Sequence, residues 1–369
     1  MGLENEIREL EEEIANTPYN KSTEEHIGRL KSKLADKKEE QEKRQQSSSG
    51  GGGYAVEQTG DATVALVGFP SVGKSTLLNK LTNAESETGS YEFTTLDVNP
   101  GMMKYRGANI QILDVPGLIE GAANGRGGGK AVLSVVRSAD LIVFVLSPFE
   151  IEQYSLLYDE LYDNKIRVDT EPPRVSVREK GKGGLRVSAS VDLDMDDETV
   201  KSVLREQSYV NADVTVHEDL GIDRLIDGVM DNRSYVPSLV TVNKVDLVEG
   251  SYTDKIQGDL NQRGLSTDEV VFISAEGEMR LDVLKERIWD DLSLKRVYLD
   301  KPSRGVDYDE PLILRRDSTV SDACEKIGGE LDEKFRFARV SGDSVEYEKK
   351  QVGGEHVLSD EDVMRIVTA

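Results

Sequence analysis

The sequence predicts an α/β protein built around a doubly wound, mostly parallel sheet of the P-loop type. Two observations carry this prediction. Strand and helix patterns alternate from Gly60 onward, which is typical of such a fold. A glycine-rich stretch between the first strand and the first helix has the spacing of a phosphate-binding loop. We expect this domain to occupy residues 60–165 and 235–293.

Length and composition favour a soluble, cytoplasmic protein of two or three domains. The chain has 369 residues, and its lone Cys324 excludes a disulfide framework and favours a reducing compartment. The N-terminus is charged from Glu4 and lacks the apolar region of a signal peptide. The longest apolar run, Leu141–Leu146, is far too short to cross a bilayer, so no membrane partner is expected.

The chain is strongly acidic, with 70 acidic against 46 basic residues and a net charge of −24. Such a surface normally argues against nucleic-acid partners, and we expect no DNA partner, because phosphate binding depends on Lys and Arg. In multi-molar salt, however, screening weakens the repulsion between like charges within the chain, and a large net charge helps to keep the protein soluble. The composition favours a salt-adapted, halophilic source over an ordinary acidic protein. In that setting acidity does not exclude an RNA partner.

Residues 1–45 are predicted to form a helical hairpin. Apolar residues recur at helical spacing in each half, and Ser22 with Glu25 has the spacing of a capping box for the second helix. The hairpin fits a solvated spacer and a docking arm for a partner equally well. Residues 46–59 include a run of serines and glycines, which predicts a flexible linker.

A phosphate-binding loop is predicted directly after a buried strand over Thr63–Val67. Its residues are Gly68, Phe69, Pro70, Ser71, Val72, Gly73, Lys74 and Ser75, followed by Thr76 at the helix start. The glycines let backbone N–H groups point at phosphate oxygens, and the helix N-terminus adds its dipole. Lys74 is expected to reach the β- and γ-phosphates, and the Ser75 hydroxyl to ligate Mg²⁺. The alternative is a glycine-rich turn with a chance lysine.

Two later stretches fit the switch regions of a nucleotide triphosphatase. Thr94 and Thr95 lie in a loop after the first helix, where a threonine can hold Mg²⁺ while its backbone senses the γ-phosphate. The strand Ile110–Leu113 then leads into Asp114, which would hold the metal through water. The Gly117 N–H would face the γ-phosphate.

The base is predicted to be guanine. A short buried strand ends in Asn243 and Lys244, followed at the right spacing by Asp246, whose carboxylate can accept both N–H donors of the guanine edge. Lys244 would lay its stem across the purine, and the turn at Ser274 and Ala275 can present a backbone N–H to the guanine carbonyl. Taken alone, this motif could be a polar turn. Because it follows the other motifs in the right order, it indicates a GTPase.

Residues 166–234 form an insert that is longer than one helix connection requires. Two segments alternate like strands around a turn at 180–184, followed by a helix over Asp196–Glu206 and another strand. The alternatives for this part are a solvated hairpin and a phosphate-facing RNA surface, with the RNA surface slightly favoured. Its basic residues are Arg174, Arg178, Lys180, Lys182 and Arg186.

Residues 294–369 show short strands and one helix over Val320–Ile327, which is a β-grasp pattern. The segment follows a helix over Leu281–Leu292 that closes the nucleotide-binding domain. It contains no residue pattern typical of catalysis. We therefore expect a binding module.

Taken together, these motifs resemble the Obg-related GTPases, and most closely the developmentally regulated GTP-binding (Drg) proteins. The resemblance covers essentially the whole chain, and the most specific stretches are Phe93–Leu96 and Gly121–Lys130. It implies that Thr95 rather than Thr94 holds Mg²⁺. It also implies that the insert is similar to a ribosomal-protein domain and that the C-terminal segment is a TGS domain.

The resemblance implies a switch protein that binds GTP or GDP with Mg²⁺ and acts in translation, on ribosomes or RNA, with a small companion protein. Lys74, Thr95 and Gly117 would take part in hydrolysis. Leu118 occupies the position of a water-orienting side chain, so slow intrinsic turnover is expected. Ser71 stands where a K⁺-ligating Asn is usual, which leaves K⁺ use open, and Arg126 could act as an arginine finger or contact a partner. The alternative function is a GTP-gated adaptor with negligible hydrolysis.

Overall fold

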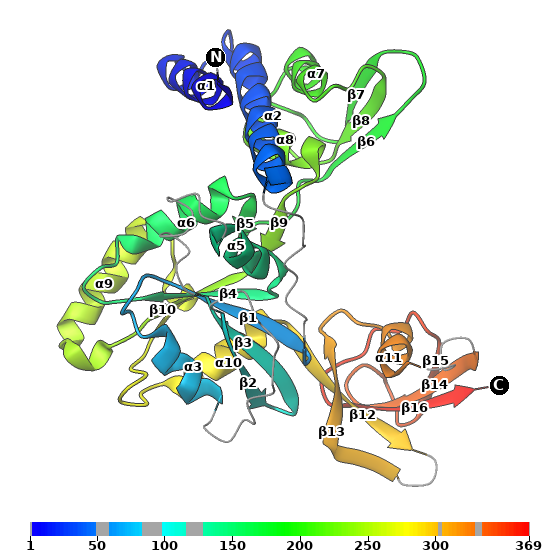
Figure 1. Ribbon diagram of the computed structural model, residues 1–369. Helices are drawn as coiled ribbons and strands as arrows, with labels where there is room; N and C mark the ends of the chain where they lie inside the picture. The colour runs from blue at the N-terminus through cyan, green and yellow to red at the C-terminus, as the bar shows by residue number, and fades with distance from the viewer. Residues whose placement is uncertain are drawn as a thin grey trace. The chain divides into compact units, whose positions relative to one another are not determined.

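The chain folds into two compact units. The computed structural model describes residues 2–48, 59–82, 98–115, 128–301, 305–328 and 334–368. The first unit combines Met1–Gly53 with Lys165–Tyr235, and the second combines Tyr54–Asn164 with Val236–Ala369. Each unit is therefore assembled from two separate stretches of chain (Figure 1).

A six-stranded sheet forms the centre of the second unit. Its strands are β1 (Ala62–Val67), β2 (Asn99–Tyr105), β3 (Ala108–Asp114), β4 (Leu141–Leu146), β10 (Ser238–Val242) and β11 (Val270–Phe272). They lie in the order β11-β10-β4-β1-β3-β2, and only β2 runs antiparallel to its neighbour. Every residue of β1 and β4 is buried, as expected for strands covered on both faces. The predicted doubly wound fold is confirmed.

Helices cover both faces of this sheet (Figure 1). They are α3 (Lys74–Thr82), α5 (Gly128–Ser138), α6 (Gln153–Asp163), α9 (Gly250–Gln262) and α10 (Leu281–Asp291), with the short 3₁₀ turns η1 (Val245–Leu247) and η2 (Thr267–Glu269). Leu77 of α3 and Ile288 of α10 are fully buried in one core cluster with the sheet. Val136 of α5 and Leu157 of α6 are also fully buried. The strands β1, β4, β10, β11 and β3 run parallel, so the loops after β1, β10 and β11 lie at the carboxyl edge of the sheet, together with Asp114 at the end of β3.

A second, five-stranded sheet follows toward the C-terminus. It contains β12 (Leu294–Lys301), β13 (Gly305–Arg315), β14 (Phe335–Ser341), β15 (Lys350–Val352) and β16 (Asp362–Thr368), in the order β13-β12-β16-β14-β15, together with α11 (Val320–Ile327). A capping box between Thr319 and Asp322 starts α11. The buried Val320 and Ala323 of this helix pack on one face of the sheet. The predicted β-grasp pattern is confirmed.

The two sheets of this unit share apolar contacts. Leu294 and Ile313, in the first and second strands of the C-terminal sheet, are buried in the core cluster of the nucleotide-binding domain. The Arg315 guanidinium donates to the Asp140 carboxylate and, at 2.7 Å, to the Leu292 carbonyl. Asp140 in turn accepts a hydrogen bond of 2.8 Å from the backbone N–H of Thr63 in β1. The C-terminal sheet is thus tied directly to the central strand.

The first unit contains a three-stranded sheet and the N-terminal helices. Its elements are α1 (Leu3–Asn16), α2 (Glu24–Ser48), β5 (Ile166–Val168), β6 (Val175–Glu179), β7 (Leu185–Ala189), α7 (Asp197–Glu206), β8 (Ala212–Val216), α8 (Ile222–Met230) and β9 (Ser234–Val236). The interpretation of residues 174–188 as a hairpin is wrong. Strand β8 lies between β6 and β7, antiparallel to the first and parallel to the second.

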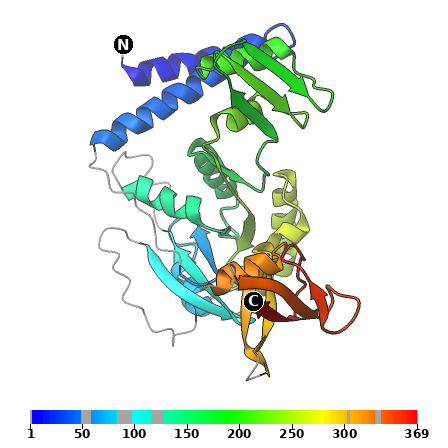
Figure 2. The ribbon, with the colours of Figure 1, turned by 90° about the vertical axis from the view of Figure 1, so that its right-hand side faces the viewer.

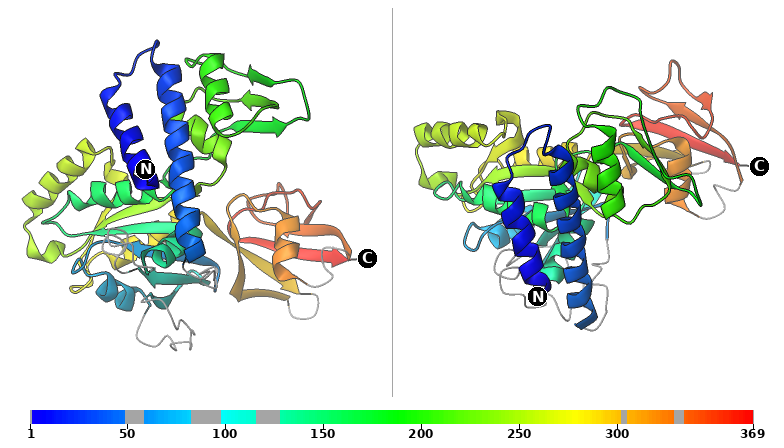
Figure 3. Two further views of the ribbon diagram at one scale, coloured as in Figure 1. Left: turned by 45° about the horizontal axis from the view of Figure 1, so that its top comes forward. Right: turned by 90° about the horizontal axis from the view of Figure 1, so that it is seen from above.

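The second N-terminal helix is also part of the core of the insert. Helices α1 and α2 lie side by side (Figure 3), and Ile27 of α2 joins the core cluster built on α7, α8 and β8. The buried Ser32 hydroxyl donates to the Val203 carbonyl at 3.1 Å. Helix α2 runs to Ser48, into the predicted linker. The predicted capping box does not form, because the helix begins at Glu24 and the Ser22 backbone N–H, which Glu25 would receive, donates to Asn20 Oδ1 instead.

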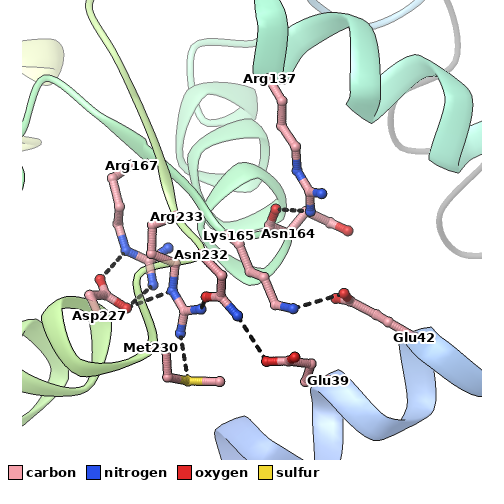
Figure 4. A network of polar contacts seen from close by, with 10 residues as sticks. All are labelled: Glu39, Glu42, Arg137, Asn164, Lys165, Arg167, Asp227, Met230, Asn232 and Arg233. Carbon is pink, nitrogen blue, oxygen red and sulfur yellow. Dashed lines mark hydrogen bonds and ion pairs between the residues drawn. The ribbon is translucent and has the colours of Figure 1, made fainter. Parts of the chain in front are cut away.

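A buried ionic cluster holds the ends of the insert together. Strands β5 and β9 pair as a short stem, and the Asp227 carboxylate receives guanidinium donors from Arg167 at 2.6 and 3.0 Å and from Arg233 at 2.6 Å (Figure 4). All three side chains are less than a tenth exposed. Nearby, Lys165 pairs with Glu42 of α2 at 2.8 Å, so the helix is fixed to the stem as well as to α7.

None of the helices within the described ranges combines the length and apolar character needed to span a membrane.

Removing the shared carboxylate should strongly destabilise the first unit. In Asp227→Ala, two buried guanidiniums lose their counter-charge, and we expect a loss of about 3–5 kcal/mol in the free energy of unfolding. Denaturant unfolding of the full chain, with hydrogen exchange of the amides of β6–β8, measures this loss. The matched control is Asp223→Ala, whose half-exposed pair with Lys31 should contribute less than about 1 kcal/mol. Equal losses in both variants would contradict a structural role for the cluster.

Candidate functional site

The loop between β1 and α3 is shaped by two glycines. Gly73 adopts φ 98°, a conformation that favours glycine, and a Cβ there would lie 2.5 Å from the Asn243 amide nitrogen. At Gly68 a Cβ would lie 2.4 Å from the Val145 carbonyl oxygen of β4. Side chains at either position would push the loop away from its neighbours. The loop therefore follows the path that the predicted phosphate cradle requires.

Lys74, at the start of α3, turns back into this loop. Its ammonium donates to the carbonyl oxygens of Gly68 at 2.9 Å and Phe69 at 3.2 Å. Burial lowers the pKa of Lys74, and the Asp114 carboxylate offsets part of that shift. The ammonium is thus held inside the curve of the loop, where a phosphate chain would lie. Pro70 and Ser71 form the exposed outer part of the loop, whereas the Val72 side chain is buried beneath it.

Ser75 and Asp114 meet at the adjacent strand end. The Ser75 hydroxyl donates to Asp114 Oδ2 at 2.5 Å, and Asp114 is almost fully buried. The second carboxylate oxygen, Oδ1, is buried with no hydrogen-bond partner among the described residues. A hydroxyl beside an unsatisfied carboxylate oxygen fits the oxygen chemistry of Mg²⁺ or of its bound water. Two predicted contributors, Thr95 and Gly117, lie outside the described residues, as do Leu118 and Arg126.

Asn243 joins the phosphate loop to the opposite end of the site. Its buried side chain donates to the Val72 carbonyl at 2.9 Å and accepts from the Ala275 backbone N–H at 2.8 Å. The amide can bridge because it carries both a donor and an acceptor. Sequence reasoning assigned Asn243 to reading the base and missed this bridge. No local pattern in the sequence indicates the bridge, because Val72 and Ala275 both lie far from Asn243 along the chain.

The remaining base-reading candidates surround this bridge. Lys244 takes φ 65°, and its ammonium donates to the Ser71 carbonyl at 2.6 Å. Ser274 and Ala275 are buried, and the Ser274 hydroxyl accepts from the Gly277 backbone N–H at 2.9 Å. Asp246 is exposed in η1, so its carboxylate is accessible to a purine edge. The described candidates therefore lie at one edge of the sheet, on loops or at the adjoining ends of β3 and α3, with Thr76 in the first turn of α3.

Three protein-family models match successive parts of the chain. Residues 63–180 match the model described as a 50S ribosome-binding GTPase, and residues 182–294 match the C-terminal region of that domain. Residues 295–368 match the TGS domain. Together these matches extend over both the candidate site and the C-terminal sheet.

Curated relatives match over the full length. An uncharacterized GTP-binding protein of Halobacterium salinarum is 66% identical, covering 100% of this chain and 99% of the relative. Human developmentally-regulated GTP-binding protein 2 is 40% identical, covering 100% of each chain. Among solved structures, the YchF GTPase of Schizosaccharomyces pombe matches with a TM-score of 0.48 and 15% identity, covering 84% of this chain and 99% of the other.

The bend at Gly73 gives a direct test of the loop geometry. In Gly73→Ala the new methyl group meets the Asn243 amide and the backbone is strained, so we expect at least tenfold weaker binding of guanine nucleotides. Equilibrium titration with a fluorescent GDP analogue measures this. Gly258→Ala in α9 is the control, since nothing lies within 4 Å of the added carbon. Unchanged affinity in Gly73→Ala would rule out the close packing of loop and bridge as a requirement for binding.

Proposed function

Because the chain belongs to the developmentally regulated GTP-binding proteins and is a GTPase, we propose that it is a Mg²⁺-dependent switch acting in translation, on ribosomes or ribosomal RNA. The observation that supports the nucleotide part is the Asn243 bridge, which links the loop after β1 to the loop after β11. The second candidate is a GTP-gated adaptor whose hydrolysis is incidental. It is favoured by Leu118, which cannot orient an attacking water.

Nucleotide recognition divides between the two ends of the site. Lys74 and the N–H groups of the loop neutralise the phosphates, whereas Asp246 accepts from the guanine edge. The Ala275 N–H, which was predicted to meet the guanine carbonyl, donates instead to Asn243 Oδ1. Lys244 is held beside the loop by its bond to the Ser71 carbonyl, with its stem available to the purine face. These contacts are made with substrate and product alike, so they account for binding rather than for rate.

The hydrolytic step depends on the γ-phosphate end. Bound Mg²⁺ would neutralise charge on the β- and γ-phosphates, with Ser75 and Thr95 as its protein ligands and Asp114 holding its water. Lys74 stabilises charge that develops on the phosphate oxygens, and the Gly117 N–H would sense the γ-phosphate. Since Leu118 cannot position water, turnover without a partner should be slow. The use of K⁺ near Ser71 stays open.

A ribosomal or RNA partner is supported by the description of the matching family model and by the surface of the insert. On the outer side of its sheet, Arg178 and Arg186 lie in register on either side of Asp213. Lys180 also pairs with that aspartate, so three cations surround one carboxylate. A local excess of positive charge in so acidic a chain suits phosphate contacts. We place this activity in the cytoplasm and expect a small companion protein.

The base-reading assignment is tested by Asp246→Asn. An amide has one acceptor oxygen where the carboxylate has two, so it cannot pair side by side with both N–H donors, but its NH₂ can donate to the carbonyl oxygen that xanthine carries in place of the amino group. We expect guanine affinity to fall by at least a hundredfold and xanthine nucleotides to bind instead. Competition between GDP and XDP analogues measures the change. Asp254→Asn in α9 is the control, and retained guanine selectivity in Asp246→Asn would remove Asp246 from the site.

The switch is tested by co-sedimentation with ribosomes in high KCl. The wild type should bind with a non-hydrolysable GTP analogue and not with GDP. Asp246→Asn should bind only with the matching xanthosine analogue, which shows that the nucleotide on this protein controls binding. GTP turnover that rises on adding ribosomes would support the switch. Nucleotide-controlled binding without any rise in turnover favours the adaptor, and no binding in any state contradicts the ribosomal role.

A further inference from the structure

Two aspartates hold the starts of the strands that lead to the candidate site. Asp61 directly precedes β1, and Asp140 directly precedes β4. The Asp61 carboxylate accepts from the Asn109 N–H of β3 at 3.0 Å through Oδ2, and its own N–H donates to the Asn109 carbonyl at 2.7 Å. Asp140 makes the same two bonds to Thr63 of β1, both at 2.8 Å. Each aspartate is thus bound near the start of one strand: β3, which ends at Asp114, or β1, which leads into the phosphate loop.

The second carboxylate oxygen of each aspartate, Oδ1, accepts from a cation of the C-terminal sheet or of its helix. The Lys326 ammonium of α11 donates to Asp61 at 3.0 Å. The Arg315 guanidinium, at the end of β13, donates to Asp140. Lys326 also donates to the Ile313 carbonyl of β13 at 2.6 Å, which fixes its position. One cation of the C-terminal part therefore acts on β3 and another on β1.

The turn between β2 and β3 is a third point of contact. Gly107 in this turn takes φ 84°, and a Cβ there would lie 2.5 Å from the Pro311 ring of β13, so the turn packs directly on the C-terminal sheet. The neighbouring Arg106 guanidinium lies 5.8 Å from the centroid of the Trp289 ring of α10. Figure 1 shows the C-terminal sheet beside the end of the central sheet at which β1 and β3 begin, and Figure 2, viewed from that side, shows it in front. The contacts therefore gather at the end opposite the candidate site.

We infer that Lys326 and Arg315 are positioning residues for the nucleotide site, through which the C-terminal sheet and the bound nucleotide influence each other. Lys326 acts through Asp61 and β3 on Asp114, at the metal end. Arg315 acts through Asp140 and β1 on the phosphate loop. The part that concerns Mg²⁺ rests on the proposed function, whereas the part that concerns the phosphate loop does not.

The two strands can carry a displacement because they are buried and joined to each other along their length. Every residue of β1 is buried, and so is every residue of β3 except Asn109. Their register ends with Leu66 opposite Asp114. Close-packed interiors have low compressibility, so a shift at one end of such a pair reaches the other. Coupling of this kind is reciprocal: a macromolecule that changes how the C-terminal sheet packs would change nucleotide affinity, and nucleotide would change the affinity for that macromolecule by the same factor.

The test measures the affinity of the full-length protein for a fluorescent, non-hydrolysable GTP analogue at fixed KCl, once with Mg²⁺ and once with EDTA. Lys326→Gln releases the start of β3, so affinity should fall about fivefold in Mg²⁺ and stay unchanged in EDTA. Arg315→Gln releases the start of β1, so affinity should fall about fivefold in both buffers. Lys326→Arg keeps a cationic donor for Asp61 and should restore the binding of the wild type.

Lys301→Gln is the matched control. Lys301 pairs with Asp307 at 3.1 Å within the C-terminal sheet, and its side chain is 43% exposed, against 40% for Lys326. The substitution removes a Lys–Asp pair of the same kind at a site away from β1 and β3, so nucleotide affinity should not change. Thermal unfolding reports that each variant is folded. A role limited to stability would move the melting temperature without altering the difference between Mg²⁺ and EDTA.

Three outcomes would overturn the inference. These are unchanged affinity in both Lys326→Gln and Arg315→Gln, an equal loss in Lys301→Gln, or a loss in Lys326→Gln that is as large in EDTA as in Mg²⁺. Wild-type affinity that does not depend on Mg²⁺ would instead contradict the proposed metal site, and the Arg315 pair is still tested in that case because its effect needs no metal. Failure to co-sediment with ribosomes contradicts the ribosomal role and leaves both positioning residues standing.

Discussion

The site depends on one buried amide. Asn243 is 2% exposed and spans from the Val72 carbonyl to the Ala275 N–H, so a single side chain sets the separation between the phosphate and base ends. Each bond contributes only about 1 kcal/mol to stability, but leaving either buried partner unsatisfied costs more. The tight bend at Gly73 exists because this amide occupies the space where a side chain would be. The separation between the loop after β1 and the loop after β11 is therefore set by contacts within the protein.

The central fold and the described half of the site could be predicted because local sequence determines them. Strands covered on both faces must be continuously apolar, and β1 and β4 are. Phosphate chemistry restricts which residues can stand at Gly68, Gly73 and Lys74, so spacing alone reveals the loop. The bridge made by Asn243 could not be derived in this way, because its two partners are distant in sequence and meet only after the sheet is assembled.

The first unit was harder to predict because pairing between its elements leaves little trace in sequence. Alternating strands such as β6 and β7 show which residues face the core but not which neighbour they join, and β8 takes the place between them. The apolar stripe on α2 was assigned to its hairpin partner, yet Ile27 also packs into the insert. An amphipathic stripe specifies that a surface is buried, not what buries it.

The shared core between the two sheets of the second unit makes each part depend on the other for its packing. Leu294 and Ile313 belong to the C-terminal sheet in sequence but to the nucleotide-binding domain in packing, and Arg315 reaches Asp140, which is bonded to β1. A module joined in this way is not a detachable appendix. Its transfer to another protein would leave a cavity behind and carry exposed apolar side chains with it. A substitution at Leu294 or Ile313 therefore disturbs the packing of both parts at once.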